Sequence, residues 1–440
     1  MIYKIYFYTL ILFIFTSCAN ETTENKSSED VAITCQKYKS TTSQYKEEYQ
    51  KHIQFKAPQN LKLLLADKKI AKKASFDKQG LYTLFQTEYF WAKETKKNLD
   101  ISRYSEPQKL IDDLKYKDDR WSFAVTKKLY NDAISQKSIG FGFSCHDMEV
   151  GCLITYVRID SPADKIDLRR GDIIKKINNQ TATKELIYKK GEEKKLLEFE
   201  LLRPNSNERC SGKLRAREYS YKVVKSKTLK TLKNEKVGYL RLDSFLGDGR
   251  ILAQIDNSFD NFKKESIKKL VIDLRYNGGG SVYLASKLLD KLVINKENQT
   301  QFTLAWNEAY KNRNQKYVFD YSPNSLDLKE ILFLTTQNTA SASELIISAM
   351  KPYLPEEDIV IVGDRTDGKP VGMNGEYDGN YYYFLINFVV KNSLGFYDYF
   401  NGLEVTSGCN IADDPFHEMG DPKEAMLKSA LKYIDSGSCQ

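Results

Sequence analysis

The chain has 440 residues, which is long enough for two or three domains. Its formal net charge is +8, but aromatic residues are not interleaved with its densest basic stretch, residues 222–236. We therefore expect a solvated linker there and no nucleic-acid partner. The sequence holds three histidines and has no CxxC or His–Cys cluster, so neither a metal site nor a cofactor is expected.

The first residues are typical of an export signal. Lys4 precedes a largely apolar run, residues 5–15, that is too short to span a membrane. The run ends in Phe-Thr-Ser-Cys, which resembles a bacterial lipobox and predicts a signal peptide over residues 1–18 with lipidation at Cys18. We therefore expect a lipoprotein of the bacterial cell envelope, anchored to a membrane and facing the periplasm or the cell surface. An ordinary secretory signal and an uncleaved anchor are the alternatives.

Residues 19–30 are polar and acidic, without periodicity, and residues 19–34 are predicted to form a flexible tether. Six cysteines follow Cys18. In an exported chain an even number permits disulfides, although about fifteen pairings are possible. Cys145 and Cys152 flank a short polar stretch and could close a hairpin, with free or mutually distant thiols as the alternative.

Residues 35–135 are predicted to form a helical N-terminal domain. Apolar residues recur at helical spacing over residues 81–91 and again over residues 110–114. Pro107 stands where the first turn of the second helix would begin, a common place for proline.

Residues 136–218 change to short β-like runs and resemble a bacterial PDZ domain. The run opens with Gly140-Phe141-Gly142-Phe143, whose glycines could turn backbone N–H groups toward a peptide carboxylate. The strand edge beside this loop could accept an extended peptide as an additional strand. Two further elements follow in order, a helix start at Ser161-Pro162-Ala163 and a turn at Gly171-Asp172. The alternative is a PDZ domain that only packs and binds nothing.

Residues 219–440 alternate strands and helices. Apolar runs predict buried strands over residues 237–245, 270–274, 331–335 and 359–363. Turn residues and a helical pattern follow the second and the third of these runs, which indicates α/β architecture with the working residues at strand ends. The chain is therefore expected to be an α/β (α+β) protein of several domains.

Ser341 lies in Thr-Ala-Ser-Ala-Ser-Glu, residues 339–344, where a predicted strand gives way to a helix. Small residues on both sides let a substrate backbone approach, and the N–H groups at a helix N-terminus could stabilise an oxyanion. The pattern makes Ser341 a candidate nucleophile. The alternative is a helix cap, with Glu344 in the first turn.

A glycine turn and a lysine complete the pattern. Residues 275–280, Arg-Tyr-Asn-Gly-Gly-Gly, follow a buried strand and suit a turn that points backbone N–H groups at a ligand. Phosphate binding is the competing interpretation, but the Walker Lys-Ser/Thr and a GxGxxG are lacking. Lys369 follows Gly368 after the last predicted strand. An ordinary lysine pKa of about 10.4 is too high for a base, but burial beside the serine would lower it, and a solvated lysine is the alternative.

These segments together resemble the C-terminal processing peptidase family, also called the tail-specific proteases. The family pattern reads roughly Asp-Leu-Arg-x-Asn-x-Gly-Gly, then Ala-Ser-Ala-Ser-Glu, then Gly-Lys. The chain has these motifs at residues 273–280, 340–344 and 368–369, in that order and downstream of the PDZ-like region. The resemblance implies a crotonase- or ClpP-like serine peptidase core over residues 219–440, with the PDZ domain inserted or preceding.

The resemblance also implies roles for individual residues. It makes Ser341 the nucleophile and Lys369 the general base. It assigns the oxyanion hole to the backbone N–H groups of Ala342 and of a glycine in the turn, Gly279 in the first place, with Gly280 as its neighbour. No metal or cofactor is implied.

The chain departs from the family pattern near the lysine. Many members have a glutamine four residues after the lysine to orient it, whereas this chain has Met373, so the group that orients Lys369 is open. The loop before the lysine is also changed, and the form Gly-Lys-Pro-Val-Gly looks more like the lipoprotein branch found in Bacteroidetes-type bacteria.

The expected function is that of an exported, lipid-anchored serine endopeptidase with a Ser–Lys dyad. Its expected partners are protein or peptide substrates, recruited through their C-terminal tails by the PDZ domain, and the membrane through the N-terminal lipid. Two alternatives remain: a catalytically inactive peptide-binding module on the same scaffold, and a hydrolase of another acyl substrate.

Overall fold

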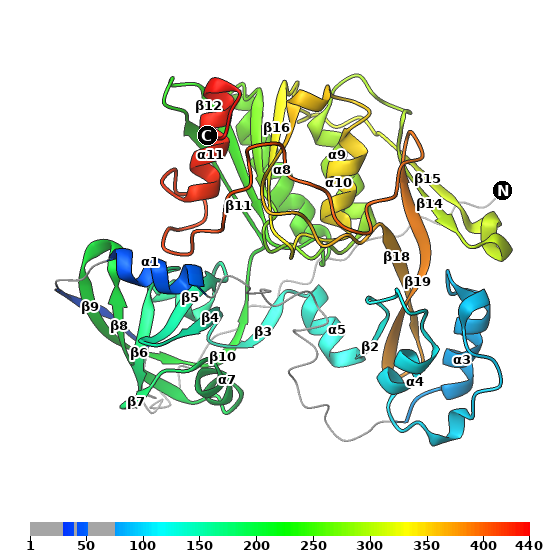
Figure 1. Cartoon of the computed structure of the whole chain (residues 1–440), viewed down its shortest axis with the longest axis horizontal. Helices are drawn as coiled ribbons and strands as arrows, with labels where there is room; N and C mark the ends of the chain where they lie inside the picture. The colour runs from blue at the N-terminus through cyan, green and yellow to red at the C-terminus, as the bar shows by residue number, and fades with distance from the viewer. Residues whose placement is uncertain (1–29, 39–41, 52–74) are drawn as a thin grey trace, which may run out of the picture.

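The computed structural model describes residues 30–38, 42–51 and 75–440. The predicted signal peptide with Cys18, and most of the predicted tether, lie outside this part. Among the residues described, no helix has both the length and the apolar character needed to cross a membrane. Figure 1 shows three groups of elements, which we call the central unit, the β unit and the helical unit.

The central unit is built on a five-stranded sheet in the order β11-β12-β13-β16-β17. Its strands are β11 (Val224–Lys230), β12 (Lys236–Leu242), β13 (Lys269–Asp273), β16 (Glu330–Thr335) and β17 (Ile359–Gly363). β11 runs antiparallel to β12, and the remaining neighbours are parallel. The carboxyl ends of β13, β16 and β17 therefore meet at one edge of the sheet.

Helices cover both faces of this sheet. They are α8 (Gly249–Lys264), α9 (Val282–Leu292) and α10 (Ala342–Met350) on one face and α11 (Ala425–Ser436) on the other. Strand side chains alternate between the two apolar clusters, because Leu270 and Ile272 pack with α8 to α10 while Val271 packs with α11. A sheet buried on both faces explains the continuous apolar runs in the sequence. The predicted α/β fold is confirmed.

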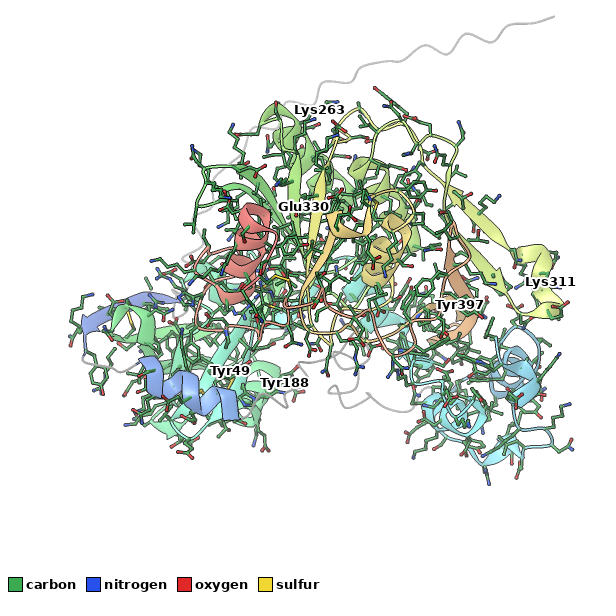
Figure 2. All side chains as sticks on the ribbon, turned by 45° about the horizontal axis from the view of Figure 1, so that its top comes forward. Tyr49, Tyr188, Lys263, Lys311, Glu330 and Tyr397 are labelled. Atoms are coloured by element: carbon green, nitrogen blue, oxygen red, sulfur yellow. A yellow bond between two sulfur atoms is a disulfide. The ribbon has the colours of Figure 1, made fainter. Side chains whose placement is uncertain are left out.

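A second sheet extends from the central unit in the order β15-β14-β19-β18, with β2 paired to β19. Its strands are β2 (Phe123–Thr126), β14 (Thr300–Trp306), β15 (Gln315–Val318), β18 (Val371–Tyr377) and β19 (Tyr381–Asn392). The 3₁₀ helix η4 (Glu308–Arg313) joins β14 to β15, and Lys311 lies at this outer end in Figure 2. A further 3₁₀ turn, η5 (Glu356–Asp358), precedes β17.

The helical unit packs on this second sheet. Its elements are α3 (Lys78–Thr87), η1 (Ala92–Glu94), η2 (Ile101–Arg103) and α4 (Pro107–Leu114). Leu81, Phe85 and Leu110 share one buried cluster with Tyr383 and Ile386 of β19. α5 (Lys127–Ile134) then leads from β2 toward the β unit.

The β unit contains a seven-stranded sheet in the order β1-β9-β8-β6-β5-β4, with β7 paired to β6. Its strands are β1 (Val31–Lys37), β4 (Phe143–Met148), β5 (Gly151–Val157), β6 (Ile173–Ile177), β7 (Gln180–Thr181), β8 (Leu196–Arg203) and β9 (Glu208–Arg215). A ribbon of β3 (Lys137–Gly140) and β10 (Arg217–Ser220) accompanies it, with α6 (Pro162–Lys165), α7 (Lys184–Glu192) and η3 (Pro204–Ser206).

The start of the described chain differs from the predicted boundaries. Residues 31–37 were expected to divide between a flexible tether (19–34) and a helical domain (35–135), yet they form β1, which pairs with β9. α1 (Thr42–Lys51) also packs on the β unit, where Tyr45 and Tyr49 join a buried cluster. Figure 2 labels Tyr49 at this helix. The partner strand lies far along the chain, so no local pattern in the tether or the helical region could reveal the pairing.

Disulfides join all six cysteines that follow Cys18. The pairs are Cys35–Cys210, Cys145–Cys152 and Cys409–Cys439. The second closes the β4–β5 hairpin, which is one of the two alternatives that the sequence left open. The first attaches β1 to β9, and the third ties the chain after α11 to a loop beside β17.

Candidate functional site

Ser341 occupies a strained turn between a buried strand and a helix. β16 ends at Thr335 and α10 begins at Ala342, directly after the serine. The backbone of Ser341 has φ 56° and ψ −116°, a conformation that a residue with a side chain rarely adopts. Its neighbours Ala340 and Ala342 are buried, while Ser341 itself is half-buried. Strain of this kind is stored at functional sites, and nucleophilic serines of other hydrolases occupy similar strand-to-helix turns.

Lys369 directly follows Gly368, a position that only glycine can occupy without strain. Gly368 has φ +88°, and a Cβ there would lie 2.4 Å from the carbonyl oxygen of Phe400 and 2.5 Å from the nitrogen of Gly402. The lysine that follows is half-buried, at the entrance to β18. The Gly-Lys pair therefore places a lysine backbone close against the loop at residues 400–402.

Glu344 joins the serine turn to the lysine loop. Its side chain is fully buried, and its oxygen Oε2 accepts the backbone N–H groups of Ser341 and Lys369, each at 2.8 Å. The two backbone nitrogens therefore lie no more than twice that distance apart. The other oxygen, Oε1, accepts the N–H of Gly368 at 2.7 Å and the hydroxyl of Thr366 at 2.5 Å. The structure thus brings the backbones of the two predicted catalytic residues together.

The environment of Glu344 also sets its charge. Burial raises the pKa of this carboxyl to about 7, while the hydrogen bonds from Thr366, Lys369, Gly368 and Ser341 oppose the rise. The carboxyl group therefore changes charge near neutral pH, and only its ionised form leaves both oxygens free to accept all four donors.

The glycine turn lies directly against Ser341. A Cβ on Gly279 would lie 2.7 Å from the Cβ of Ser341 and 3.0 Å from the backbone nitrogen of Ala342. Asn277 holds the two segments together, because its carbonyl accepts the N–H of Ala340 at 3.1 Å and the hydroxyl of Ser343 at 2.9 Å. The predicted turn and the predicted serine segment are therefore in contact.

The N–H groups near Ser341 differ in availability. That of Gly279, the predicted oxyanion donor, is directed to Oδ1 of Asn277 at 2.9 Å. Within the described residues the N–H groups of Ala342 and Gly280 donate to no protein acceptor, and Gly280 is exposed. Of the three predicted donors, the N–H groups of Ala342 and Gly280 are therefore the two that remain available to an oxyanion. The N–H of Gly279 is already bonded to the Asn277 side chain.

A buried ionic cluster holds the glycine turn from behind. Arg275 is fully buried and bonds to Asp273 at 2.9 Å, Glu424 at 2.9 Å and Asp413 at 2.8 Å. Arg170 of the β unit reaches the same oxygen of Asp413 at 2.6 Å. Burial alone would raise the pKa of Asp413, but Arg170 and Arg275 hold it well below its usual range. Asp273 and Arg275 thus form a local ion pair behind the turn, and the cluster extends to the β unit.

Met373 cannot take the place of the glutamine that the resemblance would put there. It lies on β18 opposite Ile386 and packs against the apolar cluster of the helical unit. A thioether is a weak acceptor and offers no donor. The backbone of Lys369 is instead held by Glu344, a residue that sequence reasoning considered only as part of a helix cap. The available signal was a glutamate directly after the run of small residues 340–343.

The predicted peptide-binding loop lies in the β unit. Gly140 and Gly142 both have positive φ, +136° and +89°, and join β3 to β4. Phe141 is buried against Gly191 of α7. β4, which begins at Phe143, is the last strand in the sheet order, so its outer edge faces no further strand of this sheet.

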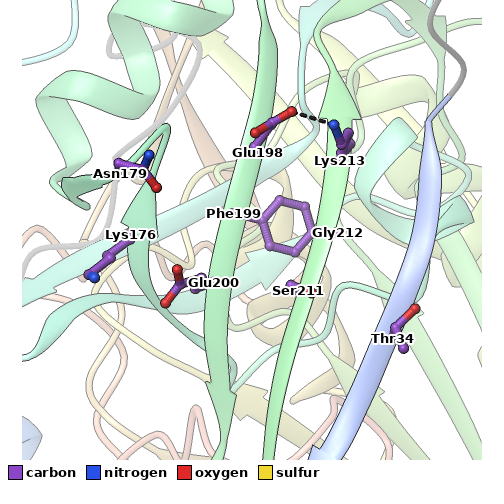
Figure 3. Close-up of a pocket in the computed structure, with 9 residues that line it drawn as sticks. All are labelled: Thr34, Lys176, Asn179, Glu198, Phe199, Glu200, Ser211, Gly212 and Lys213. Atoms are coloured by element: carbon purple, nitrogen blue, oxygen red, sulfur yellow. Dashed lines mark hydrogen bonds and ion pairs between the residues drawn. The ribbon is translucent and has the colours of Figure 1, made fainter.

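A depression of about 280 Å³ lies elsewhere in the β unit, on the surface of the sheet (Figure 3). Its lining comes from β1, β6, β8 and β9 and the turn after β6, and it includes none of the predicted site residues. The lining residues are Thr34, Lys176, Asn179, Glu198, Phe199, Glu200, Ser211, Gly212 and Lys213. Glu198 and Lys213 form an ion pair at its rim. The depression is therefore separate from the serine–lysine site.

Comparison with known proteins finds similar sequences over the region that holds Ser341 and Lys369. The family model "Peptidase family S41" matches residues 236–377, which include Ser341 and Lys369, and "Peptidase S41 N-terminal domain" matches residues 78–123. A Staphylococcus aureus (strain MRSA252) protein named "Probable CtpA-like serine protease" is 25% identical over 307 residues, covering 67% of this chain and 56% of that protein. A Staphylococcus haemolyticus (strain JCSC1435) protein of the same name is 22% identical over 264 residues, covering 58% and 49%. The chain thus spans about half the length of these relatives.

A solved structure extends the likeness to the fold. A crystal structure from Bacteroides fragilis NCTC 9343 that carries the S41 protease name has a TM-score of 0.72 and 21% sequence identity. The match covers 83% of this chain and 99% of that chain, so the arrangement of the units is shared. The two family models match in their expected order along the chain, so the chain resembles the peptidases of family S41 over residues 78–123 and 236–377, and it shares its fold with the solved structure.

Proposed function

We propose that the chain is a serine endopeptidase in which Ser341 is the nucleophile and Lys369 the general base. The observation that carries the proposal is the shared acceptor, since one oxygen of Glu344 binds the backbone N–H groups of both residues. The strained backbone of Ser341 and the family match support it.

The proposed reaction uses groups that the geometry leaves available. The neutral amine of Lys369 accepts the hydroxyl proton of Ser341 while the serine oxygen attacks the peptide carbonyl. The N–H groups of Ala342 and Gly280 stabilise the resulting oxyanion, at roughly 3–4 kcal/mol for each donor. The lysine then gives its proton to the departing amine, and a water molecule, activated by the same lysine, hydrolyses the acyl-enzyme.

Substitution of the two residues tests the dyad. Ser341→Ala and Lys369→Ala should each lower cleavage of an unfolded protein such as casein by about 10³-fold or more while the melting temperature stays unchanged. Lys391→Ala is the matched control, because Lys391 lies over the ring of Tyr397 and outside the site. Full cleavage by either site variant would refute the dyad.

The wild type and these variants also distinguish this proposal from the alternative of a peptide-binding module that does not cleave peptides. The presence of Met373 in place of the expected glutamine favours that alternative. A module of that kind would bind C-terminal peptides without turnover and would not react with a fluorophosphonate probe at Ser341. Hydrolysis of simple esters but not of peptides would indicate another acyl substrate instead.

We further propose that the β unit is a PDZ domain that recruits substrates by their C-terminal tails. The glycines of the Gly140–Phe143 loop and the outer edge of β4 support this role. Removal of the C-terminal residues of a cleaved substrate should raise KM with little change in kcat. An unchanged KM would argue against capture by the tail.

We also propose that Cys18 carries a lipid that anchors the protein in the cell envelope. The three disulfides support export to an oxidising compartment. Cys18→Ala should move the protein from the detergent phase to the aqueous phase in Triton X-114 partitioning, and retention in the detergent phase would contradict lipidation at this residue.

A further inference from the structure

The loop that carries Lys369 is held from two sides. Glu344 accepts the N–H groups of Gly368 and Lys369, as described above. On the opposite side, one nitrogen of the Arg120 guanidinium, Nη2, donates to the carbonyl of Asp367 at 2.6 Å and to that of Gly368 at 3.2 Å. The same nitrogen lies 3.2 Å from the carbonyl of Phe400, the residue against which Gly368 packs. Arg120 therefore contacts the two peptide groups directly before Lys369.

Arg120 is itself held in place by its neighbours in the helical unit. Its guanidinium lies 4.8 Å from the ring centre of Trp121, and the Trp121 indole N–H donates to the Asp367 carboxylate at 3.2 Å. The buried Asp119 accepts the backbone N–H groups of Trp121 and Ser122, both at 2.9 Å. Tyr89 donates to the second Asp119 oxygen at 2.7 Å, which ties the segment to the end of α3.

The carbonyl contacts outweigh the ion pair in this arrangement. The charged groups of Arg120 and Asp367 are 4.0 Å apart and the arginine side chain is 53% exposed, so that pair contributes little. Hydrogen bonds from a charged donor to carbonyl oxygens are stronger, and the single nitrogen Nη2 lies within reach of three such oxygens. A lysine side chain is one bond shorter and lacks the planar group that lies over Trp121, so it would hold these carbonyls less well.

We infer that Arg120 is a positioning residue for the proposed base, because it holds the peptide groups that precede Lys369. Together with Glu344 it orients the lysine, the role expected of the glutamine in whose place Met373 stands. The inference rests on the proposed Ser341–Lys369 dyad. It makes the helical unit, which is remote in sequence, a part of the catalytic centre.

Two variants with a matched control test the kinetic consequence. Arg120→Ala should lower kcat on casein about 10- to 100-fold, with KM within a factor of two, and Arg120→Lys should fall between it and the wild type. Arg103→Ala is the control, since Arg103 is similarly exposed in the same unit and lies over Tyr104. Guanidinium ion at millimolar concentration should partly restore Arg120→Ala and leave Ser341→Ala inactive.

Hydrogen exchange tests the positioning independently of catalysis. In Arg120→Ala, the amides of Gly368 and Lys369 should exchange about tenfold faster, while those of α10 keep their wild-type rates. Wild-type exchange in this loop, wild-type kcat, or a loss of kcat that follows a general loss of stability would each overturn the inference. Full activity in Ser341→Ala would instead overturn the proposed function, and the exchange result would still show whether Arg120 holds the loop.

Discussion

Glu344 is a buried carboxyl group whose two charge states favour different properties. The protonated form favours folding, and the ionised form favours the proposed activity. Its folded pKa, about 7, lies above the ordinary value of 4.5. Its contribution to stability is therefore fully present below pH 4.5 and is lost as the pH rises through 7. The ionised form, in contrast, is the one that accepts all four donors from the serine turn and the lysine loop. The site is thus better organised above neutral pH, where the carboxylate is less favourable for folding.

This titration predicts the acid limb of the pH profile. Activity should fall below about pH 7 as Glu344 gains a proton, and the need for a neutral lysine acts in the same direction. The Thr366 hydroxyl lowers the pKa of Glu344, so Thr366→Val should raise that pKa and move the acid limb to higher pH. We expect kcat/KM at pH 6.5 to fall roughly 3- to 10-fold, with a smaller loss at pH 9.

The control for this profile is Thr155→Val, since the Thr155 hydroxyl is also buried and bonds to the carbonyl of Ser144 in the β unit. It should keep the wild-type profile. An acid limb in Thr366→Val that stays in place, or moves to lower pH, would show that Glu344 does not set it.

Parallel strands bring three chain segments to one place at the scale of elements. β13 pairs with β16 and β16 with β17, all in the same direction, so the turns that follow them share one edge. The first turn supplies the glycines, the second Ser341, and the third leads to Lys369. Each segment is short and ends at a helix or strand that packs in the core. A small change in the backbone of one turn therefore moves the site residues that this turn carries.

The glycine turn offers a direct test at this scale. A Cβ on Gly280 would lie 2.2 Å from the carbonyl carbon of Phe245 and 2.4 Å from the nitrogen of Leu246, and φ is +142°. Gly280→Ala should therefore lower the free energy of unfolding by at least about 2 kcal/mol and remove most activity. Urea unfolding and casein cleavage measure both effects.

Gly249→Ala is the matched control, because nothing lies within 4 Å of the position of its Cβ and it begins α8. It should keep activity and raise the free energy of unfolding by about 0.5 kcal/mol. Equal stability of the two variants would mean that the Gly280 turn tolerates a side chain.

Asp413 connects two units at the scale of the whole molecule. It accepts Arg170 from the β unit and Arg275 from behind the glycine turn. Because both arginines lower its pKa, its contribution to stability is present above the ordinary carboxyl value of 3.8 and is lost as the pH falls through the lower folded value. α1 lies beside this contact, with Tyr49 packed edge-on against Phe416. The β unit is thereby fastened to the side of the central unit that carries the glycine turn.

Removal of the charge on Asp413 should therefore lower the free energy of unfolding strongly. Asp413→Asn leaves two buried arginines without their shared carboxylate, and we expect about 3–5 kcal/mol less stability in denaturant unfolding near pH 7. Asp327→Asn breaks exposed pairs with Lys268 and Lys329 and should cost less than about 1 kcal/mol. Similar losses in both variants would show that the Asp413 contact does not join the units.

The sequence by itself determined the α/β fold and the local pattern of the site, because both depend on short-range features. Apolar runs predicted the buried strands, and small residues and glycines marked the turns at Ser341 and at residues 278–280. Only the tertiary structure decided that Glu344 also binds the backbone of Lys369, that Arg120 contacts the lysine loop and that residues 31–37 and 42–51 belong with the β unit. These contacts join segments far apart in the chain, and their free energy comes from packing and hydrogen bonds that no local pattern encodes.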